Sequence, residues 1–83
     1  MIPFIADIKR QYQDAIVLVD IDGTYYAYDS DAFVLNSVFG LPMERHVLGM
    51  RCYVDRACKP LLVLRSHNIS YVLWRDGNIV LTY

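Results

Sequence analysis

The sequence has little of several features that mark particular protein classes. It contains two cysteines, no long apolar run, and a net charge of −1 over 83 residues. The spacing of Cys52 and Cys58 matches no common zinc pattern, and only His46 and His67 could complete a ligand set. We therefore expect no metal site, no cofactor and two reduced thiols, as in a cytosolic protein.

The lack of a run of about 18 apolar residues predicts no transmembrane helix and no membrane partner. Residues 1–11 lack a charged segment followed by a long apolar core, so we expect no signal peptide and a cytoplasmic location. The net charge argues against a strongly basic nucleic-acid binder. The charge is uneven, however, because residues 1–43 carry six acids and two bases, and residues 44–83 carry three acids and six bases. The second half could contact phosphate or form an ordinary mixed surface.

The overall composition predicts a single folded domain spanning residues 1–83. It is 55% hydrophobic and 20% charged, which is typical of a globular protein, and the length suits one small domain. Seven tyrosines are many for this length. Tyrosine suits half-buried sheets and binding faces, where the ring packs and the hydroxyl stays in contact with water.

The first half of the chain gives clear secondary-structure signals. Apolar periodicity, turn residues and capping residues predict a helix at 3–13, a buried strand at 15–21, a turn at Asp22–Gly23, an aromatic strand at 25–28 and a helix at 29–39. Gly40 is expected to cap the second helix, and Pro42 prevents its simple continuation.

The second half is less regular. Residues 46–50 are expected to form a third strand. Apolar residues from Val54 to Leu62 recur at helical spacing, but Pro60 conflicts with a helix interior. Either the helix is kinked there or it begins near Lys59 with Pro60 in its first turn, which we favour. Two strands, at 69–75 and 78–83, flank Asp76–Gly77 as a hairpin.

The order of these elements predicts an α/β fold of the α+β kind. We expect a small mixed β-sheet of about five strands, flanked by two to three helices. The sequence contains no repeat, low-complexity segment or linker.

One motif resembles that of a phosphotransferase. Asp20 and Asp22 follow a hydrophobic strand as Asp-x-Asp-Gly-Thr, which resembles the first motif of the haloacid dehalogenase superfamily. The resemblance implies that Asp20 attacks phosphorus, that Asp22 acts as acid and base, and that magnesium neutralises charge. The rest of the chain departs from that family, since Lys59 precedes Ser66 and no adjacent acidic pair follows Asp31. We therefore expect no enzymatic activity and interpret the motif as turn chemistry.

A longer stretch matches a second family. A helix carrying Lys-x-x-Tyr-x-Asp leads into a hydrophobic strand, aromatic residues and an Asp-Ala pair that opens the next helix. The matching residues are Lys9, Tyr12, Asp14, the run 16–19, Tyr25, Tyr28, Asp31 and Ala32. This stretch, residues 8–41, resembles the N-terminal mismatch-recognition domain of the MutS DNA mismatch-repair family, and a weaker match continues through Gly49, residues 54–67 and residues 69–74. The resemblance implies a standalone diverged copy of a mixed sheet flanked by helices.

The departures from the MutS pattern concern its mismatch reader. In that family a phenylalanine stacks on a mispaired base and a glutamate two residues later bonds to it. The aligned residues here are Thr24 and Tyr26, so we expect that mismatch reading is absent. Weak DNA binding would then use Thr24, Tyr25 and Tyr26, with Lys9 and Arg10 on phosphates. The same tyrosines could instead be sheet packing. No phosphate-binding loop occurs, so we expect no nucleotide hydrolysis.

A protein-interaction or self-associating adaptor is the alternative function. The final hairpin would supply its surface, through an exposed edge or face with Tyr71, Trp74 and Tyr83. The partners left open by the sequence are therefore DNA, another protein, or a second copy of the chain.

Overall fold

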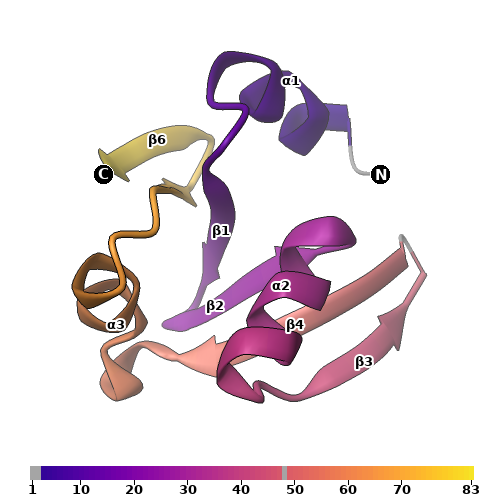
Figure 1. The fold of residues 1–83 in the computed structure, drawn as a ribbon. Helices are drawn as coiled ribbons and strands as arrows, with labels where there is room; N and C mark the ends of the chain where they lie inside the picture. Colours follow the sequence, from indigo (N-terminus) through magenta and orange to yellow (C-terminus); the bar gives the residue numbers. More distant parts are fainter. Residues whose placement is uncertain (1–2, 48) are drawn as a thin grey trace.

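A mixed β-sheet with helices on both faces forms the fold (Figure 1). The computed structural model describes residues 3–47 and 49–83. The elements follow in the order α1 (Pro3–Gln11), β1 (Ile16–Ile21), β2 (Thr24–Tyr28), α2 (Ser30–Phe39), β3 (Met43–His46), β4 (Gly49–Asp55), the short 3-10 helix η1 (Arg56–Cys58), α3 (Pro60–Ser66), β5 (Tyr71–Arg75) and β6 (Asn78–Thr82).

The sheet has the strand order β3-β4-β2-β1-β5-β6. The pair β1 and β5 is parallel, and all other neighbours are antiparallel. The central position of β1 explains its sequence, because a strand covered on both faces needs a continuous apolar run. Residues 16–19 supply that run, and all four are buried.

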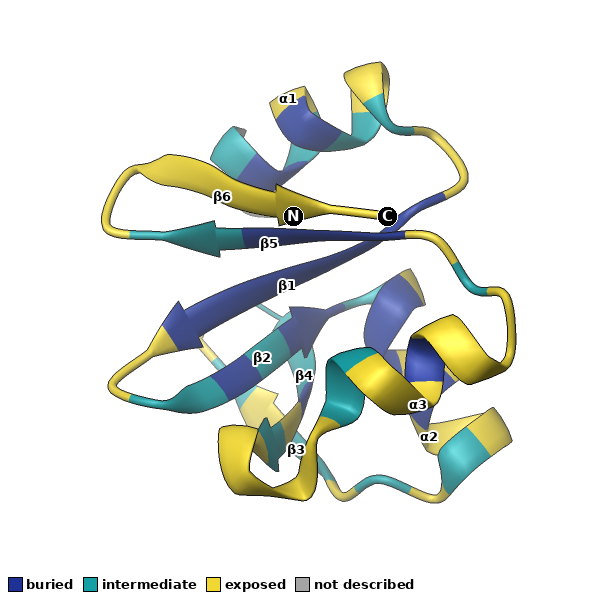
Figure 2. Ribbon diagram, turned by 90° about the vertical axis from the view of Figure 1, so that its left-hand side faces the viewer, coloured by how far each residue is buried: buried dark blue, intermediate teal, exposed yellow. Residues whose placement is uncertain are grey.

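Two apolar cores lie on opposite sides of the sheet (Figure 2). On one side, Ile5 and Ile8 of α1 pack with Val17, Val19 and Val72. The other core lies between the sheet and the helices α2 and α3. Its buried members are Ile16, Leu18, Tyr25, Ala27, Ala32, Leu35, Cys52, Leu64, Tyr71 and Leu73. The alternation of side chains along each strand therefore decides which helix a strand residue meets.

Local chemistry explains where several elements begin and end. Asp22 and Gly23 have φ of +53° and +86°, which suits the tight turn between β1 and β2. Gly40 ends α2 in the left-handed conformation, and its N–H bonds to the carbonyl of Asn36 at 2.9 Å. Pro60 is at the start of α3, as favoured from the sequence, because its missing N–H needs no partner there.

The expected fold class is confirmed, but one region was predicted wrongly. The single strand expected at 46–50 is replaced by the antiparallel pair β3 and β4, so the described residues contain six strands rather than about five. Residue 48, inside that range, lies outside the described residues. Val54 belongs to β4 and not to a helix. None of the helices in the described part of the chain is long and apolar enough to cross a membrane.

Candidate nucleic-acid interface

The α1 side of the sheet has a region that the helix does not bury. In the register of the sheet, Tyr26 of β2 lies between Val19 of β1 and Tyr53 of β4, and Thr24 lies between Ile21 and Asp55. Val19 is 3% exposed, whereas Ile21 is 46% and Tyr53 is 38% exposed. This side of the sheet thus passes from a covered centre to a surface that solvent reaches.

An aromatic and cationic cluster occupies this surface. The ring centroids of Tyr26 and Tyr53 lie 6.4 Å apart, and the guanidinium carbon of Arg51 lies 4.4 Å from the centroid of Tyr26. Arg51 also donates from Nε to Oε1 of Glu44, at 2.5 Å. Burial alone would lower the pKa of Arg51, but the hydrogen bond to Glu44 contributes to a net rise, so this cation keeps its charge.

The cluster has the chemistry of a stacking platform. Tyr53 offers an accessible ring, and Arg51 offers a planar guanidinium supported from below by Tyr26. Bases stack on aromatic rings and on arginine planes with little regard to sequence, since every base has a π face. We define Tyr26, Arg51 and Tyr53 as the platform.

Thr24, Tyr25 and Tyr26, the residues expected to contact a base, do not all face the same side of the sheet. Thr24 and Tyr26 face the same side as the platform and are half-buried. Tyr25 points to the opposite side, is 4% exposed and packs in the core beneath α2 and α3. Successive side chains of a strand point to opposite faces. Once β2 is recognised, the sequence alone therefore predicts that Tyr25 faces away from Thr24 and Tyr26.

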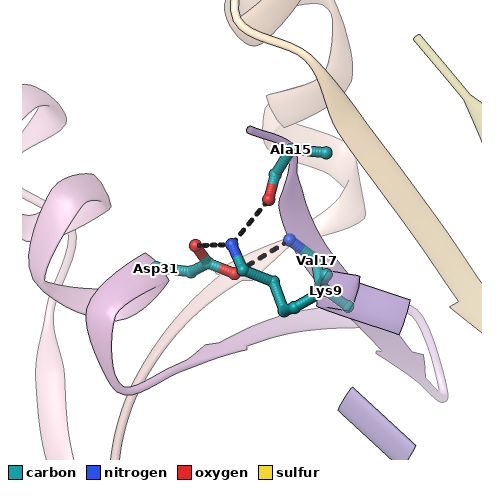
Figure 3. A network of polar contacts seen from close by, with 4 residues as sticks. All are labelled: Lys9, Ala15, Val17 and Asp31. Carbon is teal, nitrogen blue, oxygen red and sulfur yellow. Dashed lines mark hydrogen bonds and ion pairs between the residues drawn. The ribbon is translucent and has the colours of Figure 1, made fainter. Parts of the chain in front are cut away.

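Lys9, which we expected to contact a phosphate, instead binds other residues of the protein (Figure 3). Its Nζ donates to the carbonyl of Ala15 and to Oδ1 of Asp31, each at 2.8 Å. The second oxygen of Asp31 accepts the backbone N–H of Val17 at 3.0 Å, and Asp31 is only 5% exposed. The role visible for Lys9 is therefore to join α1, β1 and α2.

Arg10, the other residue expected to contact a phosphate, is far more exposed than Lys9. Its guanidinium makes an ion pair with Asp7 on the same face of α1, and both side chains are well exposed. An exposed pair of this kind exchanges readily with water and salt, so Arg10 remains accessible to an anion.

The carboxylate of Asp20, the phosphotransferase candidate, is engaged at both oxygens. Oδ1 accepts the N–H of Gly23 at 3.0 Å, and Oδ2 accepts Nε of Arg75 at 2.6 Å. The same hydrogen bond raises the pKa of Arg75. This geometry holds the β1–β2 turn against the end of β5. In the described residues, no group of three or more His, Cys, Asp or Glu side chains could hold a metal ion.

The final hairpin supplies the residues expected for protein interaction. Tyr71 is 1% exposed and stacks on Tyr83, with ring centroids 5.7 Å apart. Trp74 stacks on Phe4 of α1 at 4.5 Å and is half-buried. Tyr83 is 44% exposed. The three residues do not form one patch, because Tyr71 and Trp74 belong to opposite sides of the sheet.

Sequence reasoning missed two platform residues, Arg51 and Tyr53. Both lie in β4, the strand that was not recognised. A signal was present, because Arg51 and Tyr53 alternate with the apolar Cys52 and Val54 over a period of two.

Comparison with known proteins adds no family to this geometry. The sequence matches no model of a known protein family, and it matches no curated protein.

Proposed function

We propose that this protein is a small non-catalytic module that binds nucleic acid weakly through the platform, and single strands best. The observation that carries the proposal is the exposed Tyr53 beside Arg51, which is stacked on Tyr26. One stacked base contributes about 1–3 kcal/mol, which gives weak binding unless several contacts combine. Arg51 adds its guanidinium plane, although Glu44 already offsets part of its charge.

Because the chain resembles the MutS mismatch-recognition domain, we propose that the module acts in a mismatch-repair-like context. Thr24 and the platform residue Tyr26 lie on one side of β2, and they align with the family's phenylalanine and glutamate respectively. Threonine has no ring to stack on a mispaired base, and tyrosine has no carboxylate to bond it. The proposed module therefore binds without distinguishing mismatched from paired duplex.

The proposal assigns no enzymatic role to the Asp20 motif. Both oxygens of Asp20 accept from protein donors, which suits a carboxylate that holds the β1–β2 turn against β5. We also propose a cytoplasmic location, because the free thiols Cys52 and Cys58 suit a reducing compartment.

Fluorescence anisotropy with labelled single-stranded, paired and mismatched DNA tests the proposal. We expect single strands to bind best, with affinity that falls as salt rises. Tyr53→Ala should weaken binding roughly 5- to 150-fold, the equivalent of one stacked base. Tyr83→Ala is the matched control, since Tyr83 is a similarly exposed tyrosine outside the platform. Equal losses in the two variants, or no binding at low salt, would contradict the proposal.

An adaptor that binds protein, or a second copy of this chain, is the second candidate function. The observation that favours it is β6, an outer strand whose residues are all exposed. An uncovered strand of this kind is a surface for pairing with another chain.

A further inference from the structure

A groove of about 310 Å³ lies over the α3 side of the sheet, on the inner side of β6. Tyr25, Tyr71 and Leu81 bound it from three strands, and residues of η1 and α3 close it on the other side. Sites for small molecules usually have volumes of about 300–1,000 Å³, so the groove suits a small ligand.

The charged residues that line the groove are all cations, namely Arg56, Lys59 and Arg65. Across residues 3–47 and 49–83, none of the three has an acidic partner within ion-pair distance. Arg56 also borders a hollow that contains Asp22 and Asp76, which Lys59 and Arg65 do not line. Lys59 and Arg65 therefore give the groove a positive charge that no neighbouring acid offsets, and this charge complements an anion.

Tyr71 contributes a polar group to the same groove. Its side chain is 1% exposed, and within the described residues its hydroxyl makes no hydrogen bond. In that part of the chain, every buried side-chain oxygen or nitrogen that solvent cannot reach has a hydrogen-bond partner. The hydroxyl of Tyr71 must therefore lie where solvent reaches it, and the groove is the hollow that this residue lines. A phenol O–H in this position can donate to an anionic oxygen.

Arg65 and Tyr71 are connected through Tyr83. The guanidinium carbon of Arg65 lies 5.1 Å from the ring centroid of Tyr83, and that ring stacks on Tyr71 with centroids 5.7 Å apart. The planar guanidinium matches the paired oxygens of a carboxylate or a phosphate. A cation and a hydroxyl donor thus belong to one connected set of side chains beside the groove.

The remaining lining of the groove is largely apolar. Leu62 and Leu81 both line it and are 60% and 45% exposed. Covering these side chains would remove apolar surface from water, which is favourable. A ligand that fits this lining needs an apolar body as well as an anionic head. The phosphate backbone of a nucleic acid has no such body.

We propose that the groove binds a small amphiphilic anion, a carboxylate or a phosphate carried on an aliphatic chain. The anionic oxygens accept from the hydroxyl of Tyr71 and pair with Arg65 and Lys59, and the aliphatic chain covers Leu62 and Leu81. The site lies on the α3 side of the sheet, whereas the platform lies on the α1 side. It is therefore separate from the proposed nucleic-acid site.

Nuclear magnetic resonance titrations of the whole chain, labelled with ¹⁵N, test the proposal. The probes are octanoate and octyl phosphate, with octanol as the uncharged analogue and inorganic phosphate as the head alone. We expect saturable shifts at Leu61, Arg65 and Leu81 with an octyl anion, and binding of octanol and inorganic phosphate at least roughly 10-fold weaker. The tighter of the two anions identifies the head group.

Tyr71→Phe removes only the hydroxyl, which has no partner within the described residues. It should weaken binding of the octyl anion roughly 10-fold and leave the urea unfolding curve unchanged. Lys59→Gln combined with Arg65→Gln should weaken binding of the anion by a similar factor without affecting octanol. Arg45→Gln, which alters an exposed cation on β3 at the far edge of the sheet, is the control.

Three results would overturn the proposal. They are no saturable binding of either anion, equal binding of octanol and the anions, and full binding of the anions by Tyr71→Phe. Tyr53→Ala with DNA tests the platform and Tyr71→Phe with octyl anions tests the groove, so either site can fail without the other.

Discussion

Lys9 and Asp31 are 22 positions apart in the sequence, yet Nζ of Lys9 lies 2.8 Å from Oδ1 of Asp31. The side chains are 22% and 7% exposed, so water screens the pair only partly. The pair holds α1 against the start of α2, and Asp31 also bonds the backbone of β1. Two residues on which the resemblance to the mismatch-recognition domain depends therefore have a structural role in this fold.

The first prediction concerns this buried pair. Asp31→Ala leaves the N–H of Val17 without its acceptor and the ammonium of Lys9 without its counter-ion, with only the carbonyl of Ala15 still accepting from it. We expect the free energy of unfolding to fall by about 3–5 kcal/mol. Asp7→Ala removes the acid of the exposed pair with Arg10, and should change the free energy of unfolding by less than about 1 kcal/mol. Urea unfolding followed by circular dichroism measures both values. Similar losses of unfolding free energy in the two variants would show that the Lys9–Asp31 pair stabilises the fold no more than an exposed pair does.

Much of the fold follows from local signals in the sequence. The apolar run of β1, the turn at Asp22–Gly23, and Pro60 each specify one local conformation, and the structure contains all three. The β3–β4 hairpin was missed because β3 is a polar edge strand, Met43–His46, without apolar alternation. Only pairing with β4 makes it a strand, and that pairing is a tertiary property.

The candidate site was less predictable for the same reason. The platform combines Tyr26 from a recognised strand with Arg51 and Tyr53 from an unrecognised one. The assignment of Lys9 to phosphate was reasonable for a lysine on a helix, since its partner Asp31 comes close only after α1 and α2 have docked. Contacts between distant segments are not encoded in local patterns, so the structure is needed to separate structural from accessible charges.

The second prediction concerns Asp20. Asp20→Asn can still accept the N–H of Gly23 but loses the charge that pairs with Arg75, which is partly solvated. We expect only a small loss of unfolding free energy, because solvent reaches Arg75 and screens the pair. We also expect no magnesium-dependent hydrolysis of a phosphate monoester by either protein. Turnover by the native protein that disappears in Asp20→Asn would restore the phosphotransferase hypothesis.

The third prediction concerns the start of β4. Gly49 has φ of +130°, and a Cβ at this position would lie 2.4 Å from Oδ1 of Asp29. Gly49→Ala should therefore destabilise the fold by about 3 kcal/mol, through backbone strain and steric overlap. Gly40→Ala, at φ of +67° with open space around it, should cost about 1 kcal/mol. Thermal unfolding of both variants compares them, and equal shifts would show that Asp29 moves aside freely.

The last prediction uses the contrast between the two thiols. Cys52 is 1% exposed and its Sγ lies 3.2 Å from the carbonyl oxygen of Ala32, whereas Cys58 is exposed. Burial raises the pKa of the Cys52 thiol above its ordinary value of 9.0. Iodoacetamide should therefore label Cys58 in the folded protein, and should label Cys52 only after the protein unfolds.

The raised pKa of Cys52 also predicts how stability depends on pH. Well below pH 9.0 the thiol is protonated in both the folded and the unfolded chain, so the stabilisation is complete. Above that value the unfolded chain releases the proton first, and unfolding becomes easier by up to about 1.4 kcal/mol per pH unit until the folded thiol also ionises. Cys52→Ala retains the tyrosines but lacks this proton, so its unfolding free energy should fall less steeply between pH 9 and pH 10. Parallel curves for the two proteins would mean that burial does not perturb the thiol.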